Sequence, residues 1–218
     1  MERTYCKPTF LNISPQKREK ILSVATREFS DNGFENTNIN VIAKRAGVSV
    51  GSLYKYFNTK RELFLTVVQL GIRELERTLS QVYESGEPIL AKLEAVIRSI
   101  QRTSRGSELI RLYSGISAQE NAELAKEIAH EMEGVSARVY TELIRQGQEK
   151  GEIRGDMDAG MAAFMLDNLF MSLQFSYACE YYEERFRVYA GEDILSRDDY
   201  VVEQIIQFVK SALKKQEG

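Results

Sequence analysis

The chain has 218 residues and a net charge of −3, with 43% hydrophobic and 28% charged residues. This length and composition fit a globular protein with a substantial core and exclude collagen-like, low-complexity and largely disordered chains. Residues 1–65 hold 11 Lys and Arg against 6 Asp and Glu, a net of +5, whereas residues 66–218 hold 18 against 26, a net of −8. Although a negative protein alone argues against a nucleic-acid partner, this asymmetry indicates a basic contact module on an acidic body.

The sequence offers no metal or redox site. Its two cysteines, Cys6 and Cys179, lie far apart, and no CxxC or Cys/His spacing occurs, so we expect neither a zinc site nor another cofactor. The N-terminus lacks an apolar signal core, which predicts a cytoplasmic protein. The most apolar run, 161–179, contains Asp167 and Asn168, so it is expected to be a buried helix and not a membrane span.

The chain is predicted to be all-α. Residues 1–13 show no clear period and are expected to be a partly disordered leader. From there on, apolar residues recur at helical spacing, while no segment keeps a period of two. Gly33, Gly47 and Pro88 punctuate this pattern, since glycine ends helices and proline begins them. We predict about nine helices, over approximately 14–32, 38–46, 49–57, 59–83, 88–102, 109–113, 120–150, 157–189 and 198–213.

Two short helices around Gly47 have the properties of a helix-turn-helix. Ala43 is small where the helices would approach each other, and Gly47 is free to take positive φ in the turn. The second helix follows Ser49, a candidate cap, and is dense in tyrosine and poor in acidic residues. An apolar skeleton would join the two helices, and it consists of Ile42, Val48, Leu53 and Phe57.

A longer pattern of residues frames this motif. It consists of Phe29, Gly33, Phe34, Thr37, Ile42, Ala43, Ala46, Gly47, Val48, Ser49, Gly51, Leu53, Tyr54, Tyr56, Phe57, Lys60, Glu62 and Leu63. This pattern resembles the N-terminal DNA-binding domain of the TetR family of transcriptional regulators, over about residues 14–65. One departure is Val41, where the family often has an acidic residue that would close a capping box with Asn38.

The resemblance implies a DNA-binding transcriptional regulator of two parts, which is not an enzyme. Residues 14–60 would form a three-helix helix-turn-helix domain, and residues 61–218 a helical ligand-binding and dimerisation domain. The protein is expected to be a repressor. As a homodimer it would bind a palindromic double-stranded DNA operator through the helix after Gly47, and a small-molecule effector would release it.

Within that expectation, each candidate DNA-binding residue has a physical role. Small side chains at the start of the second helix allow close approach to base edges, and Lys55 can reach guanine or phosphate. Tyrosine hydroxyls can fix register on phosphates, although Tyr54 and Tyr56 can also serve packing. Gly51 has a packing alternative too, and Lys44 can simply be solvated. The candidate set is Thr37, Asn38, Lys44, Ser49, Val50, Gly51, Ser52, Tyr54, Lys55, Tyr56 and Lys60.

The body is expected to hold a small apolar or aromatic effector and to pair two subunits. Each candidate cavity residue has core packing as its alternative, and the only histidine, His130, is expected at the surface. The predicted cavity lining is Tyr113, Met132, Tyr140, Phe164, Asn168, Met171 and Phe175. Pairing of the last two helices would place two reading heads about 34–36 Å apart. The predicted dimer interface is Leu166, Leu169, Phe170, Leu173, Val202, Ile205 and Val209.

Two other functions remain open from the residues alone. An activator or protein-responsive factor would keep the DNA-binding head without an effector. An all-α enzyme or metal-binding bundle would need a site for which the sequence offers no nucleophile–base couple and no Glu-x-x-His pair.

Overall fold

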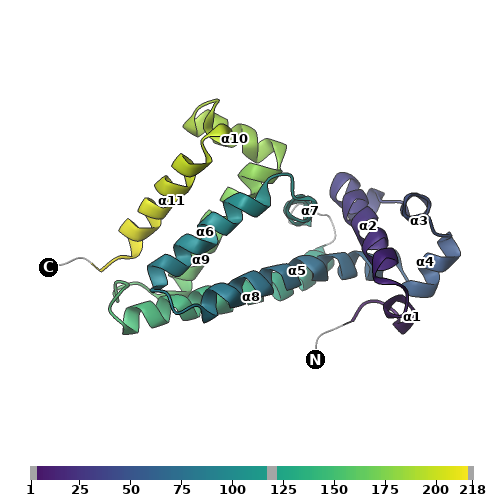
Figure 1. The fold of residues 1–218 in the computed structure, drawn as a ribbon, viewed down its shortest axis with the longest axis horizontal. Coiled ribbons are helices and arrows are strands. Elements are labelled where there is room, and N and C mark those ends of the chain that lie inside the picture. The colour runs from purple at the N-terminus through teal and green to yellow at the C-terminus, as the bar shows by residue number, and fades with distance from the viewer. Residues whose placement is uncertain (1–3, 117–121, 216–218) are drawn as a thin grey trace.

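The computed structural model describes residues 4–116 and 122–215, which form helices joined by short turns (Figure 1). This confirms the all-α prediction. No helix within these two ranges is long and apolar enough to cross a membrane. The elements are α1 (Pro8–Leu11), α2 (Pro15–Asn36), α3 (Ile39–Ala46), α4 (Val50–Tyr56), α5 (Lys60–Glu84), α6 (Ile89–Ser104), α7 (Glu108–Ile116), α8 (Ala122–Glu149), α9 (Ala159–Ala178), α10 (Glu180–Ala190), a short 3₁₀ turn η1 (Ile194–Ser196) and α11 (Asp198–Leu213).

The head consists of α2, α3 and α4, and its core is aromatic. The Phe64 ring lies 5.0 Å from the rings of both Phe29 and Phe34, with an edge-on geometry to Phe29. Aromatic pairs at this spacing stabilise a core beyond the area that they bury. Because Phe64 belongs to α5, the head core includes the first turns of the helix that leads into the body.

Two glycines set the corners of the head. Gly33 has φ 70° and ψ 172°, so the chain leaves helical geometry there before one further turn, as the sequence predicts. Gly47 has φ 72° and ψ 32°, the left-handed conformation that lets α4 turn away from α3. Side-chain caps form at four helix starts, among them the predicted Asn38 and Ser49: Ser14, Asn38, Ser49 and Thr59 each accept a backbone N–H from the first turn of their helix.

The segment before the head is ordered, contrary to the predicted disordered leader, from residue 4 onward. Phe10 of α1 is only 2% exposed, and its ring lies 4.7 Å from the Phe57 ring. The Lys7 amide donates to the Tyr56 carbonyl at 2.8 Å, and the Thr9 hydroxyl to the Lys55 carbonyl at 2.6 Å. The segment is therefore held by the buried Phe10 ring and by backbone carbonyls at the end of α4. Sequence periodicity does not reveal these contacts.

The body is a bundle in which α5 and α8 run side by side, with α6 and α9 across them (Figure 1). In Figure 1, α11 lies at the outer edge of the bundle, and it packs on α6. The head sits at one end of α5, where α2 packs against α7. Since α5 belongs to both parts, no flexible linker separates head and body.

The predicted helix 157–189 is two helices, because the backbone is extended at Cys179 (φ −124°, ψ 122°). The turn between α6 and α7 contacts the chain just before the break. There the Gly106 amide donates to the Tyr177 carbonyl at 3.3 Å, and this carbonyl would accept from residue 181 in a continuous helix. The Tyr177 hydroxyl also donates to Asp198 at 3.0 Å, so the broken end is fixed to α11.

This break and α1 account for the eleven α-helices of the described residues, against the nine predicted. The predicted helix 120–150 begins in a stretch, 117–121, that lies outside the described residues, and α8 covers its remainder.

Candidate DNA interface and effector cavity

The outer face of α4 is an accessible surface of the head. Gly51, Tyr54 and Lys55 are exposed there, Tyr54 to 50%. Lys55 makes no side-chain ion pair within the described residues, so its ammonium group is available to a partner. A short helix with a small residue, a tyrosine and a lysine on its open side suits a DNA groove, in which such side chains contact base edges and phosphates.

The first residues of α4 are held by a local hydrogen-bond pair. Ser49 accepts from the Ser52 amide at 3.0 Å, and the two hydroxyls lie 2.8 Å apart. Val50 is half-buried against the head core. The serines therefore fix the start of the helix, and their exposed hydroxyls can still accept a second partner.

Two predicted DNA-binding residues, Thr37 and Lys60, have hydrogen-bond partners inside the head. Thr37 is 4% exposed, and its hydroxyl donates to the carbonyls of Glu28 (3.0 Å) and Gly33 (2.6 Å). Lys60 donates to the carbonyls of Glu35 (2.9 Å) and Thr37 (3.3 Å). Both side chains donate to backbone carbonyls where α2, α3 and α5 meet. Backbone carbonyls need hydrogen-bond donors such as these.

Tyr56 also differs from its expected DNA-contacting role. The residue is 8% exposed, its ring lies 5.6 Å from Phe10, and Lys17 sits over it at 5.8 Å. The packing alternative therefore describes this side chain. Asn38 is occupied as the cap of α3, at 2.8 Å from the Asn40 amide, but it remains exposed, as does Lys44.

Three lysines outside the predicted DNA-binding set lie beside the motif. Lys7 donates to the Tyr54 carbonyl at 2.9 Å, at the end of α4. Lys20 lies 3.6 Å from the point that a Cβ on Gly47 would occupy, and Lys17 covers Tyr56. The signal for the last two is their spacing of three along α2, which places both on one helix face. They extend the positive charge from α4 onto α2.

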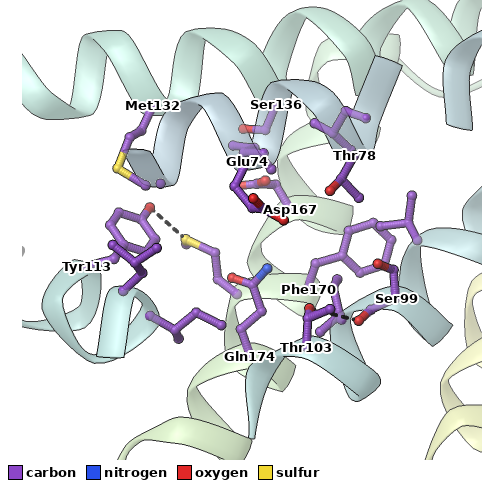
Figure 2. Close-up of a pocket in the computed structure, with 18 of the residues that line it drawn as sticks. Glu74, Thr78, Ser99, Thr103, Tyr113, Met132, Ser136, Asp167, Phe170 and Gln174 are labelled. Carbon is purple, nitrogen blue, oxygen red and sulfur yellow. Dashed lines mark hydrogen bonds between the residues drawn. The ribbon is translucent and has the colours of Figure 1, made fainter. Parts of the chain in front are cut away.

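A cavity of about 360 Å³ lies within the body, between α5, α6, α7, α8 and α9 (Figure 2). This volume falls in the range of small-molecule sites. In Figure 2, Tyr113 enters from α7 and Asp167 and Gln174 from α9, with Phe170 at the opposite end from Tyr113. Four predicted lining residues are present, namely Tyr113, Met132, Tyr140 and Met171.

The other three predicted lining residues do not line it. Phe164 is 62% exposed on the outside of α9, and the neighbouring Asn168 is exposed and donates to the Phe164 carbonyl at 2.7 Å. Phe175 is buried, but it packs between Tyr113 (5.7 Å) and Tyr182 (5.1 Å). An all-round apolar helix gives no sequence signal for which stripe faces the cavity, hence these errors.

The cavity wall raises the pKa of several acidic groups. Burial is the main cause of a raised pKa at Asp167, about 6, and the negative charge of Glu133 adds to it. The phenol of Tyr113, which donates to Glu133, and that of Tyr140 also have raised pKa values, mainly through burial. The cavity therefore combines an apolar, low-dielectric wall with acidic groups that lack compensating positive charge.

The predicted dimer interface is mostly buried inside the single chain. Leu166, Phe170, Leu173, Val202 and Val209 are 2–5% exposed, so they form subunit core and are not available to a partner. Leu169 and Ile205 are half-buried. Four large apolar side chains on these two helices are more than half exposed, namely Met161, Phe164 and Met165 of α9 and Phe208 of α11, and Tyr200 of α11 is 44% exposed.

A helix-turn-helix head fused through one long helix to a helical body with an internal cavity defines the class of DNA-binding transcriptional regulators with ligand-binding domains. Residues 21–67 match the family described as bacterial regulatory proteins, tetR family. The head therefore carries the DNA-binding domain of the TetR family, and the relatives and solved structures similar to the whole chain support a TetR family transcriptional regulator.

Relatives and solved structures agree with this assignment. The uncharacterized HTH-type transcriptional regulator YhgD of Bacillus subtilis (strain 168) is 25% identical over 170 residues, which cover 76% of this chain and 86% of YhgD. A TetR family transcriptional regulator from Chloroflexus aurantiacus J-10-FL is 26% identical with a TM-score of 0.69, covering 97% of this chain and 99% of its own. FadR from Bacillus subtilis, solved in complex with stearoyl-CoA, has the same fold at 19% identity, with a TM-score of 0.67 over 86% of this chain and 97% of its own.

Proposed function

We propose that the chain is a repressor that binds a palindromic operator as a homodimer through α4 and is released when a small molecule occupies the body cavity. The observation that carries this proposal is the position of α5. Its first turns complete the head core, and its later residues, including Leu75 and Leu79, line the cavity. A change in the cavity therefore acts on the helix that seats the head.

On DNA, α4 would lie in the major groove with Gly51 close to the base edges. Lys55 is the long donor on this face, and Tyr54 offers a hydroxyl to the phosphates. Lys17 and Lys20 would add phosphate contacts from α2. One copy has too few contacts for selective binding, so two copies would read half-sites about one helical turn apart.

The partner subunit would pack on the outward apolar side chains of α9 and α11. Met161, Phe164 and Met165 follow the spacing i, i+3, i+4 and so form one stripe, and Phe208 is exposed on α11. Large apolar groups gathered on an outer face indicate an association site. An interface of four helices, two from each subunit, would bury these groups.

Two contacts between head and body would transmit occupancy of the cavity. Arg27 of α2 pairs with Glu108 of α7 at 2.8 Å, and Arg111 of α7 contacts Asp31 at 3.3 Å. The same helix α7 lines the cavity through Tyr113. Release requires an effector that binds more tightly to a state with α7 and α5 displaced than to the DNA-bound state. Such an effector would favour the displaced state and so change the separation of the two heads.

The complex of Bacillus subtilis FadR with stearoyl-CoA supports an effector role for the cavity, since that protein shares this fold and holds a small molecule. We retain the division into a head, 14–60, and a body, 61–218, with the addition that the first turns of α5 pack into the head. A regulator that binds chromosomal DNA would act in the cytoplasm.

The test is fluorescence anisotropy with labelled duplexes from the intergenic DNA upstream of the chain's own coding region. We expect selective binding to an inverted repeat, with affinity that falls as salt increases. Equal binding to the repeat and to a scrambled duplex of the same composition would refute operator recognition. Sedimentation of the complex, with the expected two chains per duplex, tests the dimer.

A further inference from the structure

The body cavity carries negative charge that nothing in its wall balances. Glu133 of α8 and Asp167 of α9 line it, and Glu74 of α5 stands at the rim, exposed and paired with Arg77 at 2.8 Å. No lysine, arginine or histidine lines the cavity among the described residues. The undescribed stretch 117–121, Ser-Ala-Gln-Glu-Asn, also contains no basic residue.

The two inner carboxyl groups have only uncharged partners. Glu133 accepts from the Tyr113 hydroxyl, and Asp167 faces the Ser136 hydroxyl. Neither forms an ion pair with a basic side chain in the part of the chain that the structure describes. A buried carboxylate without a counter-charge is costly, and two near each other are more so. The raised pKa of Asp167 expresses that cost. A positive charge placed between the two groups would remove it.

Aromatic side chains surround the same space. Tyr140 is 3% exposed and lines the cavity, with its ring 5.5 Å from Phe170 in edge-on geometry. The residue as a whole is almost completely buried, but its hydroxyl forms no hydrogen bond with any described residue. Tyr113 lines the other end. Aromatic faces attract cations, most strongly where water is excluded.

We infer that the effector of this cavity is an organic cation, an apolar or aromatic molecule whose positive group lies between Asp167 and Glu133 and whose body lies against Tyr113, Tyr140 and Phe170. This rests on the proposed function, in which the cavity holds the effector. A metal ion fits the cavity less well, since no group of three or more His, Cys, Asp or Glu side chains suited to a metal occurs among the described residues. An anionic ligand would meet two carboxylates and no counter-charge.

The experiment compares two probes of nearly equal shape and opposite charge, tetraphenylphosphonium and tetraphenylborate, by titration calorimetry of the full-length chain in sodium buffer at pH 7.5. We expect the cation to bind about tenfold or more tightly than the anion, because juxtaposed like charges disfavour the wrong ligand. Equal affinities, or tighter binding of tetraphenylborate, would overturn the inference without the use of any variant.

Two variants locate the charge, with circular dichroism to verify their folding. Asp167→Asn and Glu133→Gln should each weaken tetraphenylphosphonium binding several-fold and narrow the gap between the two probes. Glu149→Gln, at the exposed end of α8 outside the cavity, is the matched control and should leave the affinity unchanged. If Asp167→Asn and Glu149→Gln bind the cation alike, the site lies elsewhere and the inference fails.

DNA binding, measured separately by anisotropy, distinguishes the two proposals. A chain that binds its operator and prefers tetraphenylborate keeps the proposed function and overturns the cation site. A chain that binds tetraphenylphosphonium through Asp167 but recognises no operator supports the cation site and overturns the proposed function.

Discussion

The ring of Phe10 lies against the ring of Phe57, with their centroids 4.7 Å apart, so the short helix before the motif closes one side of the recognition helix. Phe10 is 2% exposed and also contacts Tyr56 at 5.6 Å. The end of α4 is thus fixed by a residue from outside the helix-turn-helix.

Truncation of this contact should destabilise the protein. Phe10→Ala removes a buried aromatic ring, and we expect it to lower the free energy of unfolding by about 3 kcal/mol. Leu11→Ala, at the next residue of α1 and 54% exposed, should change it by about 0.5 kcal/mol or less. Urea unfolding of both variants measures the difference, and equal effects would mean that α1 contributes no packing to the head.

Lys55 should contribute to DNA recognition. Its side chain is exposed on α4 and has no ion-pair partner in the described residues, so Lys55→Ala should weaken operator binding and relax sequence choice. Anisotropy titrations with the operator and with single-base variants test this. If affinity falls equally for all sequences and the salt slope drops by about 0.9, Lys55 contacts a phosphate and reads no base. Lys214→Ala, at the far end of the body, is the matched control.

Lys60 should act on stability and not on the salt dependence of DNA binding. Its amine donates to the carbonyls of Glu35 and Thr37 and sits 4.8 Å from the Phe34 ring. Lys60→Met keeps the apolar stem but leaves two carbonyls without their donor, so we expect the melting temperature to fall while the salt slope of operator binding stays unchanged. A smaller slope with an unaltered melting temperature would return Lys60 to the set of phosphate contacts.

Sequence reasoning succeeds in the head because the determinants there are local. Gly33 and Gly47 adopt the backbone conformations for which glycine is needed, and Ser49 caps the helix that it precedes. In the body, the outcome depends on tertiary partners. At the break at Cys179, the Tyr177 carbonyl accepts from the Gly106 amide of a distant segment, and nothing in the sequence near residue 179 signals this contact.

The same limit applies to single side chains. The family pattern predicts a DNA-binding role for Thr37, and apolar character predicts a cavity role for Phe164, but the fold directs Thr37 inward and Phe164 outward. On a helix that is apolar on all sides, composition cannot distinguish core, cavity and partner stripes. Burial in the folded chain is needed to separate them.

Asp167 should make stability depend on pH. Its pKa of about 6 lies above the ordinary value because of burial, with Glu133 and Ser136 of α8 facing it. Tyr113 of α7, Tyr140 of α8 and Glu74 of α5 line the same cavity. The folded chain therefore binds this proton more tightly than the unfolded chain, and its stabilising contribution is complete at low pH and is lost as pH rises through about 6.

Asp167→Asn removes that titration, so the melting temperature of the variant relative to the wild type should be higher at pH 7.5 than at pH 4.5. Thermal unfolding of both proteins at the two pH values measures this. A packing change caused by the substitution would shift the melting temperature of the variant equally at both pH values, so it does not affect the comparison. A difference that is equal at both pH values would show that the Asp167 carboxyl group has an ordinary pKa.

Gly147 of α8 should not tolerate a side chain. A Cβ at this position would lie 2.6 Å from Ile153 Cδ1, and Ile153 is itself 1% exposed, with its amide bonded to the Gly147 carbonyl at 3.0 Å. Gly147→Ala must push this connector away from α8, at a cost of about 1–3 kcal/mol. Gly134 lies on the same helix with nothing within 4 Å of its Cβ position, so Gly134→Ala should instead stabilise α8 by up to about 1 kcal/mol. Opposite shifts of the urea midpoint for the two variants would show that the close approach of Ile153, and not helix propensity, determines the residue at 147. Stabilisation by both alanines would contradict the packing of Ile153 on α8.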